Sequence, residues 1–396
     1  MSSNRDGKGI LSTEEQKAIE ALASAFAKKT VQPMLSPAAG PDGDLSKVAA
    51  VLAEGARIGL LAEHGDGRPG AEMGIWGKVT LSIGPGLSVG LLKHISEACG
   101  GIGACFHAAG LGSLAADLFG LTGNGRLACI ISDFDDFHVM PCLSSAETAF
   151  KRATIKGEWK GTSLVIEGSK KFQLQACQTA SYVLIVPSRS GNTYTWVATI
   201  IPASDDRLKT SKVKGQMGMR AVEINTIEID NISIDKQYVA SDDNNNYVQL
   251  MYAYNLVGMT AVLTGIARGA IASAFSYARE RYQGGDLIIR HPAIRLLIAE
   301  SEMQVIAIES MLDGIAGHTP NDTPQGLVPY AAALKWIGSR GCVQAITDCL
   351  QVFGGYGYME DYGMEKRLRD GQTLKSMAGP SVTHQHTVMD AREAWS

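Results

Sequence analysis

The sequence predicts an α+β protein in which a helical domain, a β domain and a helical bundle follow one another along the chain. Apolar residues stand at helical spacing before residue 120, short β-branched runs alternate with polar turns after residue 125, and three long helical patterns come last. With 396 residues, 45% of them hydrophobic, the chain is long enough for two or three structural units. We expect domains at residues 1–125, 126–240 and 241–396.

The first domain is predicted from a helical pattern that continues from Thr13 to about Gly120. Residues 1–9 are polar and contain no apolar run, so no signal peptide is expected and the protein is assigned to the cytoplasm. The seven cysteines include no CxxC pair, which argues against a zinc or other metal site and favours a reducing compartment.

The second domain is predicted from short runs rich in β-branched residues. Their spacing is typical of a compact antiparallel β domain, and the runs lie at residues 128–131, 163–166, 182–186, 195–201 and 224–234. Residues 194–202 are almost continuously apolar, as in a strand covered on both faces. We therefore expect the β domain to lie between helical layers.

The third domain is predicted from long helical patterns at residues 250–282, 291–318 and 326–353, which form a four-helix bundle if a short last segment completes it. Residues 256–274 approach the length of a membrane span but include Arg268 and several glycines and threonines. A buried bundle helix is the better interpretation, and no membrane span is expected.

The charge of the chain excludes one class of partner. Thirty-six basic and 40 acidic side chains give a net charge of -4, without a long run of Lys or Arg. A nucleic-acid-binding protein normally has a clustered basic surface. We therefore expect no nucleic acid partner.

The C-terminal half carries motifs that are more specific than this architecture. They appear in order between about residues 160 and 395: Gly168-Ser-Lys-Lys-Phe172, Gly218-Met-Arg220-Ala221, Tyr277-Ala-Arg-Glu-Arg281, Gln351-Val-Phe-Gly-Gly-Tyr-Gly-Tyr358 and Glu365-Lys-Arg-Leu-Arg-Asp370. One glycine doublet would indicate only a turn, but the ordered set resembles the acyl-CoA dehydrogenase family. The resemblance makes the expected fold acyl-CoA dehydrogenase-like.

The resemblance also implies a chemistry. Members of the family are oxidoreductases that bury FAD between the β domain and the bundle and act on a CoA thioester, in the degradation of fatty or aromatic acids. A carboxylate removes the α proton while the flavin takes the β hydrogen as hydride. The family's usual electron acceptor is electron-transferring flavoprotein, and its members are oligomers.

Six residues match family positions that contact FAD. The glycine motif would approach the pyrophosphate of an FAD held mainly by a neighbouring subunit, because glycine lets backbone N–H groups come close to phosphate; its residues are Gln351, Gly354, Gly355 and Gly357. Arg281 matches a position that binds the diphosphate across the dimer. Phe172 matches an aromatic residue near the flavin ring. The alternatives are a tight turn, a solvated arginine and a core aromatic residue.

The family's general base is missing. Its usual glutamate position is Ala378 in this chain, and the alternative position on the first bundle helix is Asn255. Loss of a general base typically costs about 10²- to 10⁴-fold in rate. The catalytic residue is therefore unknown.

Four other side chains are candidates for a replacement base. His384 and His386 could titrate near neutral pH, although histidines in a polar C-terminal segment are more often surface residues. Asp370 is better suited to an ion pair, and His107 to a structural role.

Three functions remain open. The first is one subunit of a heteromeric α,β-dehydrogenase whose homologous partner supplies the base and most of the FAD site. The second is an FAD-containing acyl-CoA enzyme with altered chemistry, such as a lyase, a hydratase or a decarboxylating enzyme. The third is a catalytically silent scaffold subunit. An intact glycine motif beside a degraded active site favours the first.

Overall fold

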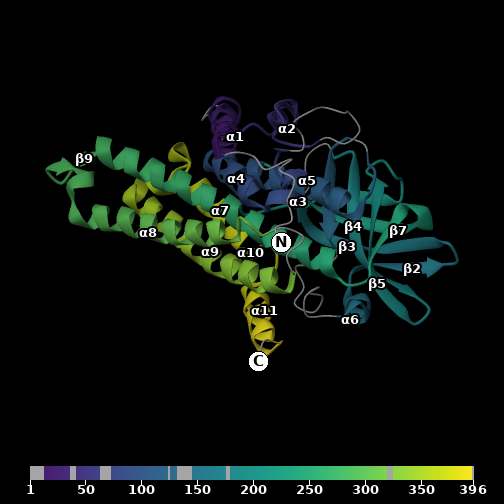
Figure 1. Ribbon diagram of the computed structural model, residues 1–396. Coiled ribbons are helices and arrows are strands. Elements are labelled where there is room, and N and C mark those ends of the chain that lie inside the picture. Colours follow the sequence, from purple (N-terminus) through teal and green to yellow (C-terminus); the bar gives the residue numbers. More distant parts are fainter. Residues whose placement is uncertain are drawn as a thin grey trace.

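The computed structural model describes residues 13–35, 42–62, 73–123, 125–131, 145–174, 179–318 and 324–394. Residues 1–9, on which the expectation of no signal peptide rests, lie outside these ranges. In Figure 1 the sheet lies at one side, the long bundle helices at the other, and the N-terminal helices lie along one face of the molecule.

The N-terminal part is helical, as expected. Its α-helices are α1 (Thr13–Phe26), α2 (Val48–Arg57), α3 (Val79–Ile83), α4 (Gly86–Ala98) and α5 (Gly100–Phe119). Helix α5 is rich in Gly and Ala and lies almost entirely in the core, where it contacts α4, the bundle and the first strand. Small side chains allow this central helix to approach its neighbours on every side.

The described residues of the middle part form an eight-stranded sheet, one short α-helix, α6 (Ala146–Arg152), and a 3₁₀ turn at Lys236–Tyr238. The strands are β1 (Leu127–Ile131), β2 (Ile155–Lys160), β3 (Ser163–Leu174), β4 (Ser181–Ser190), β5 (Thr193–Pro202), β6 (Leu208–Lys212), β7 (Ile224–Asp235) and β8 (Val239–Asp242). The sheet has the order β6-β7-β3-β2-β4-β5-β8, and β1 pairs with β4.

The pairing is mainly antiparallel, but β1 and β2 both pair with β4 in parallel. The expectation of an antiparallel β domain therefore needs this correction. An alternating or apolar run predicts a strand and the face that it buries, but it says nothing of the direction of a distant partner.

The C-terminal part confirms the three long helices. Its α-helices are α7 (Asn246–Glu280), α8 (Pro292–Ile315), α9 (Pro324–Val352), α10 (Met364–Ser376) and α11 (Ser381–Ala394). A two-stranded hairpin of β9 (Tyr282–Gln283) and β10 (Asp286–Leu287) joins α7 to α8 at the far end of the bundle (Figure 1). The division into domains at residues 125 and 240 stays a prediction.

Helices α5 and α7 are long and apolar enough to span a membrane, by length and composition. In the most apolar stretch of each helix, 89% of α5 and 83% of α7 is buried inside the protein. Both helices therefore serve as core helices of this fold, and the interpretation of residues 256–274 as a bundle helix is confirmed.

Candidate functional site

A cavity of about 560 Å³ lies where strand β3, the 213–217 loop, helices α5 and α7, and the end of α10 meet. It brings together Phe172, Asn255 and Ala378, which are separated by 83 residues or more in the sequence. The flavin-stacking position and both base positions inferred from the resemblance therefore line one site. A volume of this size is typical of a small-molecule pocket.

The described residues that line this cavity include no Asp or Glu. Its charged side chains are those of Lys170, Lys171 and Lys214, and its amide side chains include Gln173 and Gln216. A cavity with ammonium and amide donors but no carboxylate favours ligands that carry oxygen acceptors or negative charge.

Ala378 lies in the turn that follows α10. Its side chain is 4% exposed and its backbone is left-handed, with φ of 60°, and Gly379 next to it has φ of 96°. A left-handed alanine is uncommon and costs conformational energy. The methyl group of Ala378 cannot accept a proton, so this position contributes shape and backbone groups but no base.

Asn255 belongs to a buried polar chain. His107 on α5 lies 3.1 Å from Asn255 Oδ1 through its Nε2, and Trp76 Nε1 donates to His107 Nδ1 at 2.8 Å. His107 is fully buried, and this burial lowers its pKa to about 4. His107 is consequently neutral near pH 7, in line with the structural role expected for it.

Phe172 is 63% exposed although it lies within strand β3. The pairing of β3 with β7 shifts register between Lys170 and Gln173, and Phe172 has a φ of 59°. This irregularity turns the ring out of the sheet and into the lining of the cavity. The alternative of a core aromatic residue is therefore wrong.

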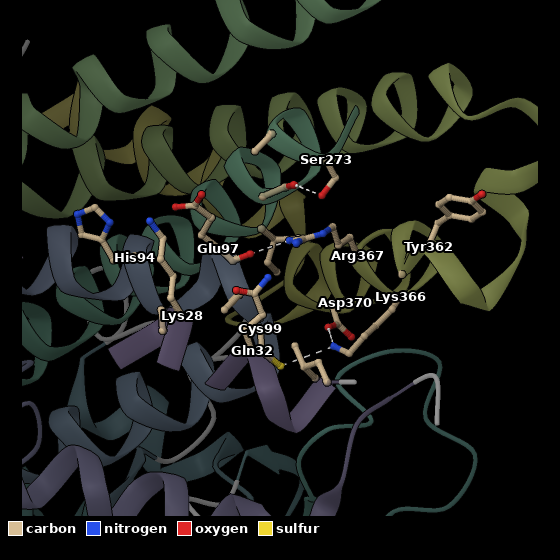
Figure 2. Close-up of a pocket in the computed structure, with 18 of the residues that line it drawn as sticks. Lys28, Gln32, His94, Glu97, Cys99, Ser273, Tyr362, Lys366, Arg367 and Asp370 are labelled. Carbon is tan, nitrogen blue, oxygen red and sulfur yellow. Dashed lines mark hydrogen bonds and ion pairs between the residues drawn. The ribbon is translucent and has the colours of Figure 1, made fainter. Parts of the chain in front are cut away.

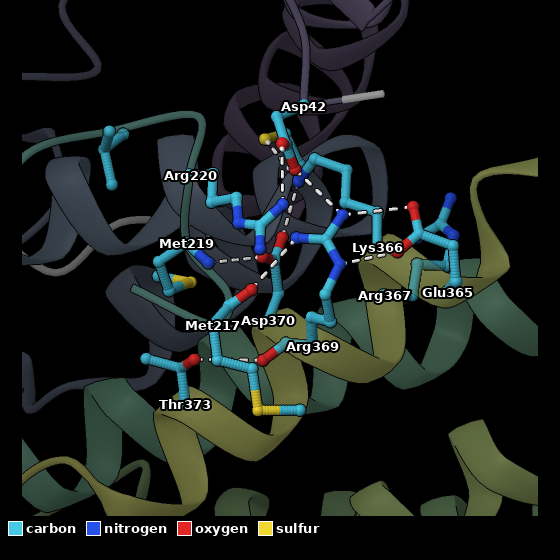
Figure 3. A network of polar contacts seen from close by, with 12 residues as sticks. Asp42, Met217, Met219, Arg220, Glu365, Lys366, Arg367, Arg369, Asp370 and Thr373 are labelled. Carbon is cyan, nitrogen blue, oxygen red and sulfur yellow. Dashed lines mark hydrogen bonds and ion pairs between the residues drawn. The ribbon is translucent and has the colours of Figure 1, made fainter. Parts of the chain in front are cut away.

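One wall of the cavity is fixed to the bundle by Asp370 of α10 (Figure 3). Its carboxylate accepts hydrogen bonds from the backbone N–H of Met219 and from Lys366 Nζ, both at 2.5 Å. Burial acts to lower the pKa of Lys366, but the Asp370 carboxylate outweighs it and the pKa is raised. The expectation that Asp370 forms an ion pair is confirmed.

Arg369 reinforces the same wall from the next position of α10 (Figure 3). Its guanidinium contacts Glu365 at 2.5 Å, Asp42 at 2.9 Å and the carbonyl of Met217 at 3.2 Å. Arg220 approaches the other oxygen of Asp42 at 3.6 Å. An N-terminal segment, a loop of the β domain and a bundle helix are thus joined by one charged network.

A second cavity, of about 550 Å³, lies on the other side of this network, between the first helices, α4, α7 and α10 (Figure 2). Lys28, His94 and Arg367 line it together with Glu97 and other acidic residues. Arg367 Nη1 donates to the backbone carbonyl of Glu97 at 2.9 Å. Charges of both signs are mixed here, so this cavity has no comparable preference for anionic ligands.

The remaining predicted FAD contacts lie together at the far end of the bundle. Arg281 directly follows α7, and its guanidinium lies 5.3 Å from the ring centre of Tyr356 in the 3₁₀ turn Gly354–Tyr358. Gln351, Gly354 and Gly355 are exposed, while Gly357 is buried. The lining of the first cavity includes none of these described residues.

Gly354 and Gly357 meet different constraints within this turn. A Cβ on Gly354 would meet no atom within 4 Å, but φ is 57°, so a turn of this shape favours glycine. A Cβ on Gly357 would lie 2.5 Å from the carbonyl oxygen of Leu350, which leaves no room for a side chain. The tight-turn interpretation therefore explains Gly354 and Gly357, whereas neither constraint applies to Gly355.

The two histidines of α11, His384 and His386, differ in their exposure to solvent. His386 is exposed, as expected, but His384 is 2% exposed and lies 3.4 Å from the hydroxyl of Tyr252. Burial, followed by the charge of Lys335, lowers the pKa of His384 to about 3. The expectation of a surface residue is wrong for His384, and neither histidine is among the residues that line the cavity.

Sequence reasoning missed three side chains, Lys170 and Lys171 in the lining of the cavity and Trp76 behind His107. Trp76 is separated from His107 by 31 residues, and no motif marks it as a hydrogen-bond donor. Lys170 and Lys171 stand inside the Gly168-to-Phe172 motif, where their adjacent positive charges offered a signal for an anionic ligand.

Residues 248–391 match the family model described as acyl-CoA dehydrogenase, C-terminal domain. The chain is 27% identical over 224 residues to cyclohexane-1-carbonyl-CoA dehydrogenase of Geobacter metallireducens, covering 55% of this chain and 58% of that protein. It is 24% identical over 193 residues to the caffeyl-CoA reductase-Etf complex subunit CarC of Acetobacterium woodii, covering 48% and 50%. The chain thus matches between half and three fifths of the length of these two relatives.

The fold of almost the whole chain matches that of a solved structure. Butyryl-CoA dehydrogenase from Megasphaera elsdenii superposes with a TM-score of 0.77, covering 99% of this chain and 100% of that structure at 16% identity. Helical, sheet and bundle parts thus follow one another as in that enzyme. The comparisons thus indicate the acyl-CoA dehydrogenase family, through the match of residues 248–391 to its C-terminal domain and through the fold of the whole chain.

Proposed function

We propose that this chain is an FAD-dependent, acyl-CoA dehydrogenase-like subunit that acts on a CoA thioester together with a homologous subunit that supplies the general base. One observation carries the proposal. Both positions at which the resemblance implies a base, Ala378 and Asn255, line the same cavity, and its described lining contains no carboxylate. The chain can therefore bind and position an acyl group, but its cavity lacks the usual proton acceptor.

The proposal that FAD is the cofactor is supported at the far end of the bundle. Arg281 Nε is buried without a hydrogen-bond partner among the described residues, although a buried guanidinium nitrogen normally has one. Gly354 and Gly355 leave open space beside it. Arg281 and this exposed turn would hold the diphosphate of an FAD bound mainly by a neighbouring subunit. When bound, FAD would supply the hydride acceptor.

The substrate end of the proposal is supported by the first cavity. Phe172 offers an exposed aromatic face, and Lys170, Lys171 and Lys214 give the site positive charge. These residues would attract a phosphate-bearing ligand and exclude water from the acyl group. The charged network of Asp370 and Arg369 would keep the cavity walls in position.

A second candidate is an FAD-containing acyl-CoA enzyme with altered chemistry, acting without a catalytic partner. It is favoured by the ordered chain from Trp76 through His107 to Asn255, which places an oriented polar group in the cavity of this chain itself. This observation also weighs against the silent scaffold.

The cellular setting belongs to the same proposal. We assign the protein to the cytoplasm, as an oligomer, with electron-transferring flavoprotein as the electron acceptor. The relative from Acetobacterium woodii is named as a subunit of a caffeyl-CoA reductase-Etf complex, which supports this choice of acceptor.

The test is native purification of the tagged chain from its own host, followed by a visible spectrum, native mass spectrometry and sequencing of co-purifying chains. A flavin-containing complex with a homologue that carries the Glu-Gly-Thr motif supports the heteromer. A yellow homo-oligomer that converts an acyl-CoA supports altered chemistry instead. A colourless chain whose removal leaves the partner fully active identifies a scaffold and refutes both.

A further inference from the structure

The polar chain beside the cavity fixes the position of one proton. The indole of Trp76 can only donate, and its Nε1 lies 2.8 Å from His107 Nδ1. That ring nitrogen must therefore be the acceptor, and a neutral His107 carries its proton on Nε2. Nε2 then donates to Asn255 Oδ1 at 3.1 Å.

Three features of the surroundings hold this arrangement in place. Trp76 is fully buried with a φ of 55°, an uncommon conformation for a large residue. Its ring stacks on Tyr254 at 5.3 Å. A Cβ on Gly258 would lie 2.1 Å from the His107 ring, so the glycine makes room for the imidazole. The position of the imidazole depends on its neighbours in both the N-terminal part and the bundle.

The direction of the Asn255 amide follows from these bonds. Its oxygen is taken by His107, so Nδ2 is the polar atom left for the cavity that Asn255 lines. Among the described residues, Nδ2 has no hydrogen-bond acceptor, and no Asp or Glu of that part of the chain lines the cavity to offer one. An amide nitrogen with two N–H groups is thus presented to whatever occupies the cavity.

We propose that Asn255 Nδ2 donates a hydrogen bond to an oxygen of the bound acyl group, and that Trp76 and His107 are positioning residues that hold the amide in this orientation. The inference rests on the proposed function, which places an acyl thioester in this cavity. The oxygen belongs either to the thioester carbonyl or to a carboxylate on the acyl chain, since both are acceptors without a donor of their own.

The expected effect is measurable. A hydrogen bond to a neutral carbonyl strengthens binding by about tenfold, and one to a carboxylate by about tenfold to a hundredfold. Loss of the Trp76 donor would remove the bond that restricts the proton to Nε2, so the form with the proton on Nδ1 would also be populated. In that form Nε2 would become an acceptor, the Asn255 amide would rotate to donate to it, and the cavity would lose its donor.

The first experiment measures ligand affinity by isothermal titration calorimetry on the complex as purified, without an electron acceptor. One pair of ligands is butyryl-CoA and its S-butyl thioether, which lacks the carbonyl oxygen. The other pair is succinyl-CoA and butyryl-CoA. Asn255→Leu keeps the size of the side chain but removes the donor. It is expected to abolish the tighter binding of the oxygen-bearing ligand in one of the two pairs. Loss in the first pair identifies the thioester carbonyl as the acceptor, and loss in the second identifies the carboxylate.

The second experiment tests the positioning residues. Nitrogen-15 NMR of histidine-labelled protein is expected to show His107 protonated on Nε2. Trp76→Phe should populate a second form with the proton on Nδ1, and it should reduce the oxygen preference in the same direction as Asn255→Leu. The matched control is Trp196→Phe, because Trp196 is equally buried but its Nε1 has no hydrogen-bond partner among the described residues.

The outcomes separate the inference from the proposed function. If the complex binds these CoA ligands and Asn255→Leu keeps both preferences, the inference is wrong and the proposed function stands. If His107 carries its proton on Nδ1 in the unmodified protein, the inference is likewise wrong. If none of these CoA ligands binds, the proposed function is wrong, and the inference that rests on it is wrong as well.

Discussion

The two buried histidines should make the protein lose stability between pH 8 and pH 5. His107 and His384 have their pKa values lowered by burial to about 4 and about 3, whereas an unfolded chain has histidine pKa values near 6.5. As the pH falls through 6.5, the unfolded state takes up two protons that the folded state does not. The free energy of unfolding must therefore decrease toward acid.

The size of the loss follows from the same values. At pH 5, a histidine with a folded pKa of about 4 contributes a loss of about 2 kcal/mol relative to pH 8, and one with a pKa of about 3 contributes nearly the same. Together they predict a decrease of about 4 kcal/mol, a large part of the stability of an ordinary domain.

The assay is urea unfolding at pH 8 and pH 5, followed by tryptophan fluorescence at one fixed protein concentration. His107→Gln and His384→Gln should each reduce the pH-dependent loss by about half. His386→Gln, which removes an exposed imidazole from the same helix as His384, is the matched control and should keep the full loss. If both buried-site variants keep the full loss, the assignment to these residues is refuted.

Three further predictions concern the charged network and the proposed cofactor site. Asp370→Asn should lower the free energy of unfolding by about 3–5 kcal/mol, because Lys366 would be left buried without its carboxylate. Denaturant titration measures this change. The control is Asp286→Asn at the exposed pair with Arg290, which should change the free energy of unfolding by no more than about 1 kcal/mol. Gly355→Asp should abolish FAD retention by the complex, since a carboxylate would face the pyrophosphate; unchanged flavin absorbance would remove this contact from the proposal. Ala378→Glu alone should not create a competent dehydrogenase, because Pro380 would still stand in place of the threonine of the Glu-Gly-Thr motif; chromatography of the CoA esters should detect no unsaturated product above the unmodified chain.

Much of the fold could be predicted because the spacing of apolar residues along the chain indicates each helix and strand locally. The three long helices repeat their apolar residues over many turns, so α7, α8 and α9 lie within a few residues of their expected bounds. The parallel pairing of β1 and β2 with β4 could not be predicted, because pairing direction is set by the path of the chain between strands.

Less of the candidate site than of the fold could be predicted from the sequence. The motifs identified Phe172 and Ala378, but the exposure of Phe172 depends on a local irregularity of β3, which alternation of residue types does not reveal. His384 is buried because α11 packs on α9, a contact that the polar composition of its helix conceals. The donor role of Trp76 required the positions of three distant segments at once.

The close approach of Gly218 to α10 has a consequence for how ligands exchange. A Cβ on Gly218 would lie 2.1 Å from the carbonyl oxygen of Arg369, and Asp370 binds the next backbone N–H along the loop. At this contact the backbone of the 213–221 loop lies against α10, and the two parts cannot move apart without breaking the buried hydrogen bond from the Met219 N–H to Asp370. Entry to the cavity must therefore depend on small movements at its rim, where the Phe172 ring lies exposed, and not on the opening of one domain away from another.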